Sequence, residues 1–217
     1  MSVRWLASFP KSGNTWARVF LANLFAHPMQ RPLSLAQINA MPLYTDASPR
    51  ETPGKEWIGK AHKAYSEETH GSRPAIYIVR DPVDIVPSAA DFFGVTRDRM
   101  SKEVAKDWPR HVLSWWGHTG LILKYENMPD NFHTLAQLLD MRVSDFNNVV
   151  DAIQGSSFSR LQQDEQSNGF VEASEKGARF FRYGKPGNGR EVLTDRQVAR
   201  VVNGAGEVYG RLGYDKS

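Results

Sequence analysis

Short apolar runs alternate with longer amphipathic stretches along this chain. Val3 to Ser8 is the first run, and a glycine-containing turn follows it. Residues 16–25 (WARVFLANLF) come next, with large apolar side chains that recur at helical spacing. The start of the chain therefore predicts a strand, a loop and a helix.

Three later runs predict further strands. Residues 57–62 (WIGKAH) and 75–80 (AIYIVR) are short, apolar and end in charged residues, as buried parallel strands do, and residues 121–126 (LILKYE) form another buried strand. Strands that alternate with helices predict an α/β protein with a parallel sheet flanked by helices. Ligands of such sheets bind outside the carboxyl ends of the strands.

The stretches between these strands predict helices. Asp81 is a candidate N-cap and Pro82 a first helical residue for a helix that ends near residue 93. We expect further helices at 102–117, 130–140 and 144–154. Residues 28–56 hold five prolines, which predicts an irregular binding loop with one short helix at 33–41.

The C-terminal tail carries a helix start signal. Thr194 and Gln197 have the spacing of a capping box, in which each side chain bonds the backbone of the other residue. The predicted helix has an apolar face made of Val198, Val201, Val202, Val208 and Leu212.

Composition limits the classes of function. The chain has 217 residues, of which 41% are hydrophobic and 24% charged, so residues 1–217 predict one globular domain. Its formal charge is only +3, and its lysines and arginines are scattered, so we expect no nucleic-acid partner. A small ligand with a few phosphates accounts equally well for the excess of positive charge.

The chain contains no cysteine, which excludes disulfides, thiolate zinc sites and a cysteine nucleophile and suits a reducing compartment. It runs from MSVRWLAS directly into the turn, and no apolar run reaches the roughly 18 residues that span a bilayer. We therefore expect a soluble, cytoplasmic protein without a signal peptide or a membrane segment.

The turn SFPKSGNTW, residues 8–16, has the composition of an anion-binding loop. Gly13 allows the backbone N–H groups to point inward, and the helix that follows adds the positive end of its dipole. Lys11 adds a charge, and Ser12, Asn14 and Thr15 offer side-chain donors. A loop for ATP has its lysine after the last glycine, whereas here the lysine precedes it. A polar turn without a ligand is the alternative.

The segment PKSGNTW closely resembles PKSGTTW, the 5′-phosphosulfate loop of the soluble sulfotransferases that use 3′-phosphoadenosine 5′-phosphosulfate (PAPS), with Asn14 in place of a threonine. The resemblance runs from Val3 to about Tyr214. It implies a three-layer α/β sandwich related to the P-loop nucleotide kinases. It also implies that Trp16 stacks on adenine, although core packing of this tryptophan is the alternative.

Other motifs match the family's site for the 3′-phosphate. In VRDPVDIVPS the resemblance assigns this phosphate to Arg80 and Ser88, whose helix is unusual in containing Pro87. A structural pairing of Arg80 with Asp81 or Asp84 is the alternative.

The segment FFRYGKPGNG resembles the family's RKG element, with Tyr183 where a lysine is common and Gly189 where a tryptophan often follows, so that one charge is missing. The segment SSF resembles the family's TSF, and LKYENM holds a tyrosine that the family places near the adenine edge. The resemblance thus adds these nucleotide-binding residues: Tyr125, Ser156, Phe158, Phe180, Phe181, Arg182, Tyr183 and Gly184.

Sulfonate transfer to a hydroxyl needs a base for the proton and cations for the leaving phosphate. His62 follows Lys60 at the end of a predicted strand, and KAH here matches the family's KTH. The resemblance makes His62 the general base, Lys60 a supporting charge and Lys11 the stabiliser of the bridging phosphate oxygen. Taken alone, a histidine at a strand end is more often structural. The sequence shows no metal-ligand spacing, so we expect no metal.

We expect the acceptor pocket to be aromatic and to suit an apolar molecule with one alcohol or phenol. Its candidates are Phe9, Tyr44, Phe92, Phe93, Trp115 and Trp116, together with His111, which could instead be a core histidine. A natural product, a carrier-bound substrate and a sugar remain open as acceptors, as does a homodimer.

The leading hypothesis is an enzyme that transfers sulfonate from PAPS to a small-molecule hydroxyl and releases adenosine 3′,5′-bisphosphate (PAP). One alternative is a kinase of related fold that uses ATP and Mg²⁺, which needs a lysine after the glycine and a carboxylate for the metal. Another is a nucleotide-binding protein without catalytic activity.

Overall fold

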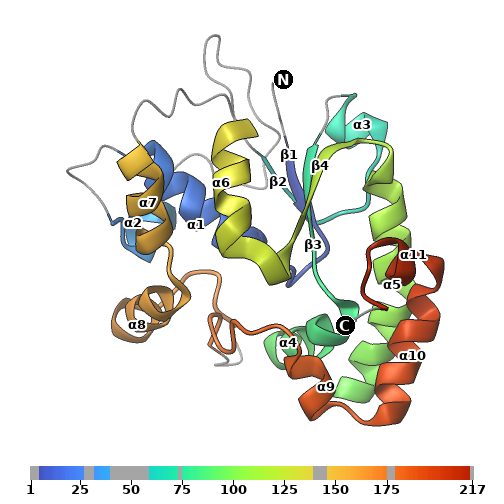
Figure 1. Cartoon of the computed structure of the whole chain (residues 1–217). Coiled ribbons are helices and arrows are strands. Elements are labelled where there is room, and N and C mark those ends of the chain that lie inside the picture. The colour runs from blue at the N-terminus through green and yellow to red at the C-terminus, as the bar shows by residue number, and fades with distance from the viewer. Residues whose placement is uncertain are drawn as a thin grey trace.

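A computed structural model describes residues 5–26, 32–39, 59–72, 75–138, 146–174 and 179–215. Tyr44 and most of the proline-rich excursion lie outside the described residues. The centre is a parallel sheet in the order β2-β1-β3-β4 (Figure 1). Its strands are β1 (Trp5–Ser8), β2 (Gly59–Ala61), β3 (Ala75–Val79) and β4 (Thr119–Lys124). The predicted parallel α/β sheet is confirmed.

Strand β1 lies between β2 and β3, so the next two strands of the chain pair with its opposite edges. Ala7 pairs with Ala61 on one side and with Tyr77 on the other. A reversal of this kind leaves a crevice at the carboxyl ends of the adjacent strands. The turn after Ser8 and the residues after Val79 both start at this crevice.

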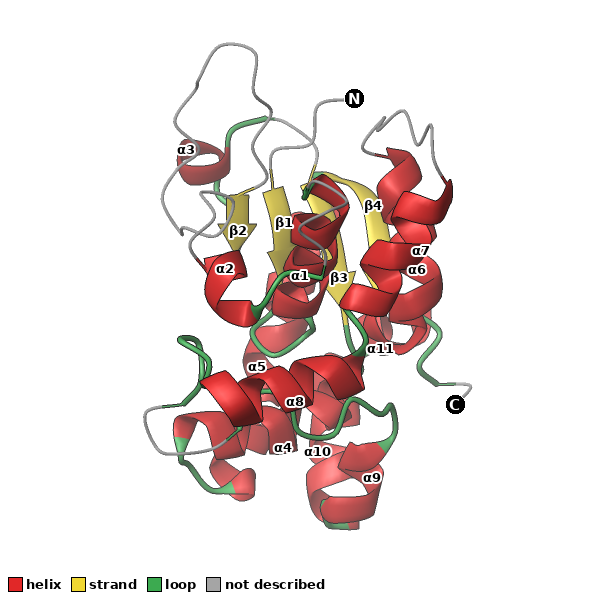
Figure 2. Ribbon diagram, turned by 90° about the vertical axis from the view of Figure 1, so that its left-hand side faces the viewer, coloured by secondary structure: helices red, strands yellow, loops and turns green. Residues whose placement is uncertain are grey.

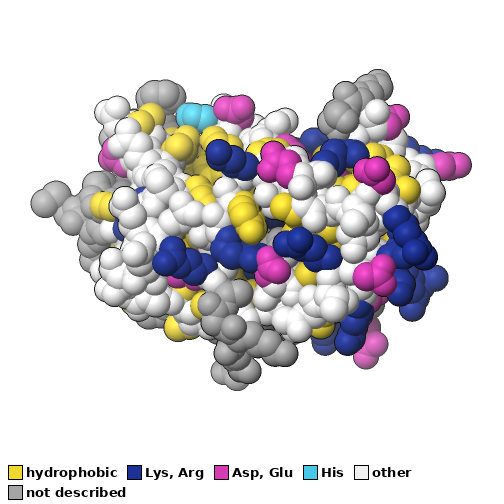
Figure 3. All heavy atoms as spheres, turned by 90° about the horizontal axis from the view of Figure 1, so that it is seen from below, with side chains coloured by type: hydrophobic (Ala, Val, Ile, Leu, Met, Phe, Trp, Pro, Cys, Tyr) yellow, Lys and Arg dark blue, Asp and Glu magenta, His cyan; other side chains and the backbone are white. Residues whose placement is uncertain are grey.

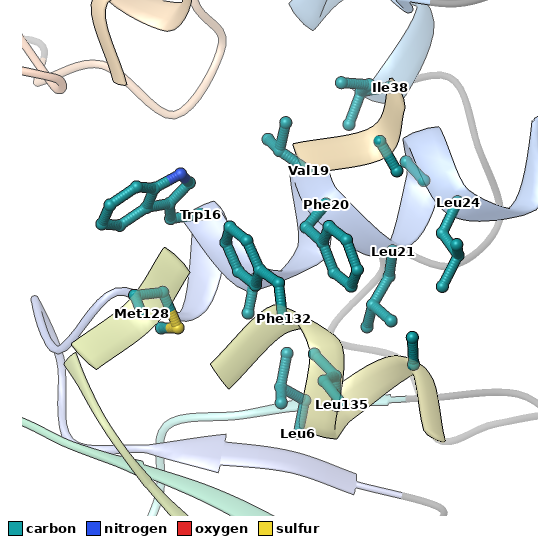
Figure 4. Packing of buried hydrophobic residues seen from close by; sticks show 14 of the residues in the cluster. Leu6, Trp16, Val19, Phe20, Leu21, Leu24, Ile38, Met128, Phe132 and Leu135 are labelled. Carbon is teal, nitrogen blue, oxygen red and sulfur yellow. The ribbon is translucent and has the colours of Figure 1, made fainter. Parts of the chain in front are cut away.

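One face of the sheet packs against α1 (Asn14–Phe25), α6 (Met128–Leu138) and α7 (Phe146–Gly155). Leu6, Ile76 and Leu123 point to this side, since alternate strand residues face the same way. Figure 4 shows this layer, in which Phe20 and Phe132 lie face to face at 4.3 Å between ring centroids.

The other face packs against α4 (Pro82–Phe93), α5 (Arg97–Trp116), α10 (Asp195–Ala205) and α11 (Glu207–Arg211). Ala7, Tyr77 and Val79 belong to this second core. Figures 1 and 2 show the sheet between the two helical layers, which is the expected three-layer sandwich.

Local capping explains where several helices start. The Asp81 carboxylate accepts a hydrogen bond of 2.8 Å from the Val83 N–H, which confirms the predicted N-cap of α4. Helix α5 begins at Arg97, earlier than predicted, because Thr96 caps it. The capping box of Thr194 and Gln197 is present at α10.

The predicted C-terminal helix is divided into α10 and α11 by Gly206, which has a φ of 55°. Its apolar face is confirmed: Val201, Val208 and Leu212 are buried, and Val198 and Val202 pack against them partly buried.

The short helix expected at 33–41 is α2 (Leu35–Asn39). Helices α3 (Glu67–His70), α8 (Phe158–Asn168) and α9 (Asn188–Val192) were not predicted, and a single 3₁₀ turn (Tyr125–Asn127) follows β4. Helix α8 is mostly polar, so its sequence shows little periodicity. No helix in the described part of the chain is long and apolar enough to cross a membrane.

Candidate active site

A cavity of about 610 Å³ opens at the carboxyl ends of the strands, where segments far apart in sequence meet. Figure 3 shows this face of the molecule from below, with lysine and arginine side chains interleaved with hydrophobic ones across its middle. The predicted site residues that line the cavity are Lys11, Gly13, Asn14, Thr15, Trp16, Lys60, His62, Arg80, Ser88, Phe92, Phe93, Tyr125, Phe158, Phe180, Phe181, Arg182, Tyr183 and Gly184.

Some predicted residues lie beside the cavity rather than in its wall. Ser156 is buried, its hydroxyl donates to the Ala152 carbonyl oxygen at 2.6 Å, and its own carbonyl oxygen accepts from Trp16 Nε1 at 2.6 Å. Ser156 therefore holds the tryptophan in place instead of facing a ligand. Trp115 is in the core and Trp116 is exposed, and neither lines the cavity.

Phe9 and His111 contact each other outside the cavity, with ring centroids 5.5 Å apart. His111 Nε2 lies 3.1 Å from the His62 carbonyl oxygen, so it carries the ring proton, and Nδ1 accepts from the Tyr77 hydroxyl at 2.8 Å. Burial lowers the pKa of His111 to about 4. This neutral, buried histidine holds the backbone of residue 62, which agrees with the alternative of a core histidine, and its contact with the acceptor stays a prediction.

The loop after β1 turns sharply through two residues with positive φ, Lys11 at 67° and Gly13 at 96°. A Cβ at position 13 would lie 2.5 Å from a ring carbon of Tyr125, so only glycine fits there. The Asn14 amide donates to the Leu6 carbonyl oxygen at 2.8 Å and accepts from Arg18 Nε at 3.0 Å. Its side chain thus fixes the loop to β1 and α1, and its contact with a ligand stays a prediction.

The Lys11 ammonium lies between two aromatic rings, 4.0 Å from the centroid of Phe92 and 3.8 Å from that of Phe180. Burial, Arg182 and Arg80 together lower its pKa to about 7. The site therefore concentrates positive charge that a bound anion would balance.

Arg80 leaves the end of β3 and reaches the loop. One of its NH groups donates to the Lys11 carbonyl oxygen at 3.1 Å, and its guanidinium lies 4.2 Å above the centroid of the Tyr125 ring. Asp84 instead accepts from the N–H groups of Gly187 and Gly189. Among the described residues no ion pair joins Arg80 to Asp81 or Asp84, so the structural alternative for Arg80 does not hold there.

Two carboxylates hold the segment that covers the cavity. Glu165 of α8 accepts from the N–H groups of Phe180 at 2.5 Å and Phe181 at 2.9 Å. Asp84 of α4 accepts from Gly187 at 2.7 Å and Gly189 at 2.6 Å. Each carboxylate bonds two backbone groups, so both ends of this segment are fixed to helices.

The glycines of this segment are required by close approach. A Cβ at Gly184, whose φ is 61°, would lie 2.6 Å from the Phe158 ring. A Cβ at Gly189 would lie 2.3 Å from the Val83 carbonyl oxygen. The glycine at 189 is therefore a steric requirement of this chain's packing. Arg182, between these anchors, forms an ion pair with Asp91.

The hydrogen bonds of His62 assign its tautomer. Its Nδ1 lies 3.0 Å from the Ser8 carbonyl oxygen, which can only accept, so Nδ1 carries the proton. The Nε2 atom of the neutral ring then carries no hydrogen. The ring belongs to the residue directly after β2 and lines the cavity with Lys60.

Sequence reasoning missed two charged residues of this site. Arg18 lies on α1 and Glu172 in a loop after α8, and they form an ion pair at 2.8 Å. Arg18 follows Thr15 by three residues on the same face of α1 and donates to its hydroxyl at 2.9 Å, and this spacing was the signal in the sequence. Nothing in the sequence around Glu172 indicates its partners.

Two polar atoms at this end of the sheet are buried without a hydrogen-bond partner in the part of the chain that is described, Ser12 Oγ and Arg80 Nε. Buried polar groups normally have partners, and a phosphate oxygen would satisfy the Arg80 donor. The described residues contain no cluster of histidines and carboxylates that could hold a metal ion. The donors present fit an anionic, phosphate-bearing ligand.

None of the known protein families matches the sequence, and no curated protein matches it either. Solved structures do. Mouse sulfotransferase SULT7A1, complexed with PAP, matches with a TM-score of 0.65 and 19% identity over 91% of this chain and 81% of that chain. The chain has the sulfotransferase fold.

Two structures of retinol dehydratase agree with this assignment of the fold. The complex with androsterone and the inactive cofactor PAP matches with a TM-score of 0.65 and 13% identity, over 96% of this chain and 80% of that chain. The complex with retinol and PAP matches with a TM-score of 0.64 and 13% identity, over 96% and 81%. The fold implied by the sequence motifs is confirmed, at identities too low for sequence comparison to detect.

Proposed function

We propose that this protein is a sulfotransferase that moves a sulfonate group from PAPS to a hydroxyl of a small molecule and releases PAP. One observation carries the proposal: a single cavity unites Lys11, Arg80 and Arg182 with aromatic side chains and with His62. The PAP complexes of the structurally similar proteins support the choice of nucleotide.

The aromatic end of the cavity suits adenine. Trp16 and Phe158 both line it, and their rings contact each other edge to face, with centroids 5.6 Å apart and an interplanar angle of 74°. Adenine would therefore lie beside this pair and not between the two rings. Arg80, Ser88 and Arg182 would hold the 3′-phosphate, and the backbone of the loop before α1 would hold the 5′ end. The bound donor supplies an activated sulfonate.

The chain's own residues handle the proton and the charge. His62 Nε2 takes the proton of the acceptor hydroxyl while the acceptor oxygen bonds to sulfur and the sulfur–oxygen bond to the 5′-phosphate breaks. Lys11 balances the charge that this leaves on the phosphate of PAP, and Lys60 adds positive charge beside the base. These roles are assigned from the family motif and agree with the positions of the three residues in the cavity.

The mouth of the cavity suits an apolar acceptor. Phe93, Val171 and Tyr183 line it and are 47%, 77% and 47% exposed, so they form an apolar rim. We infer an acceptor with an apolar scaffold and one alcohol or phenol. The retinol and androsterone complexes of retinol dehydratase support this class.

Thermal unfolding with nucleotides tests the proposal. PAP at 100 times its Kd, without Mg²⁺, is expected to stabilise the protein by about 2.7 kcal/mol, because a ligand that binds only the folded state shifts the equilibrium. ATP with Mg²⁺ should give no shift at the same concentration. Stabilisation by ATP and Mg²⁺ alone would identify a kinase and contradict the proposal.

Binding of PAP is expected to take up protons at pH 8. Lys11 has a pKa of about 7 in the nucleotide-free protein, so it is mostly neutral at pH 8, and a nearby phosphate raises its pKa. Affinity for PAP should therefore fall as the pH rises from 7 to 9. Calorimetry in buffers of different ionisation enthalpy measures the uptake. Lys11→Met should abolish it, and an unchanged uptake in this variant would exclude Lys11 as its source.

A further inference from the structure

Glu172 places a negative charge beside the loop to which the donor's 5′ end is assigned. Its carboxylate accepts from Thr15 Oγ1 at 2.8 Å and from an NH₂ group of Arg18 at 2.8 Å. Its Oε1 also lies 3.5 Å from Lys60 Nζ. Thr15, Lys60 and Glu172 all line the cavity.

The hydrogen bonds of Thr15 indicate that the Glu172 carboxylate and a phosphate of the nucleotide would compete for the Thr15 hydroxyl. A threonine hydroxyl has one hydrogen, and the Glu172 carboxylate, which can only accept, takes it. Arg18 donates to the same hydroxyl oxygen at 2.9 Å. Thr15 Oγ1 therefore cannot donate to a phosphate while its bond to Glu172 persists.

The negative charge of Glu172 also opposes a second anion at this position. Arg18 and Lys60 outweigh the effect of burial and hold the pKa of Glu172 at about 2, so the carboxylate is ionised at neutral pH. The Arg18 side chain is only 4% exposed and that of Glu172 22%, so water screens their surroundings weakly. A second anion at this position would be repelled.

The backbone on the N-terminal side of Glu172 lies at the surface in a hydrogen-bonded turn. Val171 is 77% exposed, and the turn contains a hydrogen bond of 2.9 Å from the Ala173 N–H to the Phe170 carbonyl oxygen. On the following side the Ser174 hydroxyl donates to the Phe92 carbonyl oxygen at 2.6 Å. Glu172 thus contributes its carboxylate to the cavity from a surface turn, not from a helix or strand.

We propose that Glu172 is an internal counter-anion that lowers nucleotide affinity: it holds Thr15, Arg18 and Lys60 in the nucleotide-free protein and is exchanged for the anionic 5′ end of the nucleotide on binding. This inference rests on the proposed function. It makes Glu172 a determinant of donor affinity that the sequence motifs do not contain.

Calorimetric titration with PAP tests the exchange. Glu172→Gln keeps the shape of the side chain and removes its charge, and it is expected to lower the Kd of PAP at least fivefold. Glu172→Asp keeps the charge and should stay within twofold of the unaltered protein. Glu207→Gln changes the net charge equally at an exposed ion pair outside the cavity, and it should also leave the Kd within twofold.

Each result decides between the two proposals. If the unaltered protein binds PAP and Glu172→Gln binds it equally or more weakly, the exchange is wrong and the sulfotransferase proposal stands. An equal gain in Glu172→Gln and Glu207→Gln would also overturn the exchange, since net charge alone would then explain it. Failure of every form to bind PAP overturns both proposals. Glu172→Ala, measured by circular dichroism and calorimetry, provides a second charge-free variant should the glutamine variant not fold.

Discussion

Replacing His62 by alanine is expected to lower the rate of sulfonate transfer by about 10²–10⁴-fold, the usual contribution of a general base. The Kd of PAP should stay within a few-fold, because the ring lies at the end of β2 and is not among the residues assigned to the phosphates or the adenine. The measurement is transfer of labelled sulfonate from PAPS to a panel of apolar alcohols and phenols, paired with calorimetry of PAP binding.

His118→Ala is the matched control for this variant. His118 is an exposed histidine that stacks on Tyr65 at 3.6 Å and does not line the cavity, so its removal should leave the rate unchanged. Full activity of the His62 variant would mean that another group takes the proton. Loss of PAP binding together with activity would show that His62 supports the loop and not the chemistry.

Replacing Arg80 by methionine is expected to raise the Kd of PAP about 100-fold, since two hydrogen bonds to a charged group contribute roughly 1.5 kcal/mol each. The variant also loses the bond to the Lys11 carbonyl oxygen and the contact with the Tyr125 ring. Calorimetry with PAP measures the loss.

Arg80→Lys separates charge from geometry. Lysine keeps the positive charge but lacks the planar fork of donors, so we expect an intermediate Kd, about tenfold weaker than that of the unaltered protein. Arg99→Met removes an arginine from an exposed pair with Glu103 and should have no effect. A Kd unchanged in Arg80→Met would show that the 3′-phosphate lies elsewhere.

Signals between neighbouring residues predicted much of the fold. The N-cap at Asp81 and the capping box at Thr194 involve partners two or three residues away, so the sequence shows both members together. The strands were visible as short apolar runs because both faces of the sheet are covered. Helix α8 was missed because it lies at the surface with few buried residues and has no strong apolar period.

The sequence predicted contacts of the candidate site only for residues that belong to a recognised motif. Asn14 was predicted as a ligand donor from its place in the loop, and the sequence did not show that its amide also bonds the Leu6 carbonyl oxygen and Arg18. The sequence offered His111 as a candidate contact for the acceptor or as a core histidine. In the structure both of its ring nitrogens are hydrogen-bonded, one to the Tyr77 hydroxyl and the other to the His62 carbonyl oxygen. Residue type and spacing show which groups are available and not which partner each group has.

The chain's local patterns were sufficient for the alternation of the strands with most of the helices and for the anion-binding turn, and the family resemblance supplied the roles of Lys11 and His62, from which the chemistry is inferred. The pairing of Glu172 with Arg18 and Thr15, and the bonds of Asp84 and Glu165 that hold the cover of the cavity, came only from the folded chain. Hydrogen bonds within a turn or at a helix cap join residues a few positions apart, so the sequence shows both partners at a fixed spacing. Partners that meet only in the folded chain, such as Arg18 and Glu172 at a separation of 154 residues, leave no such signal, because the fold alone decides which carboxylate reaches each cation or backbone N–H group.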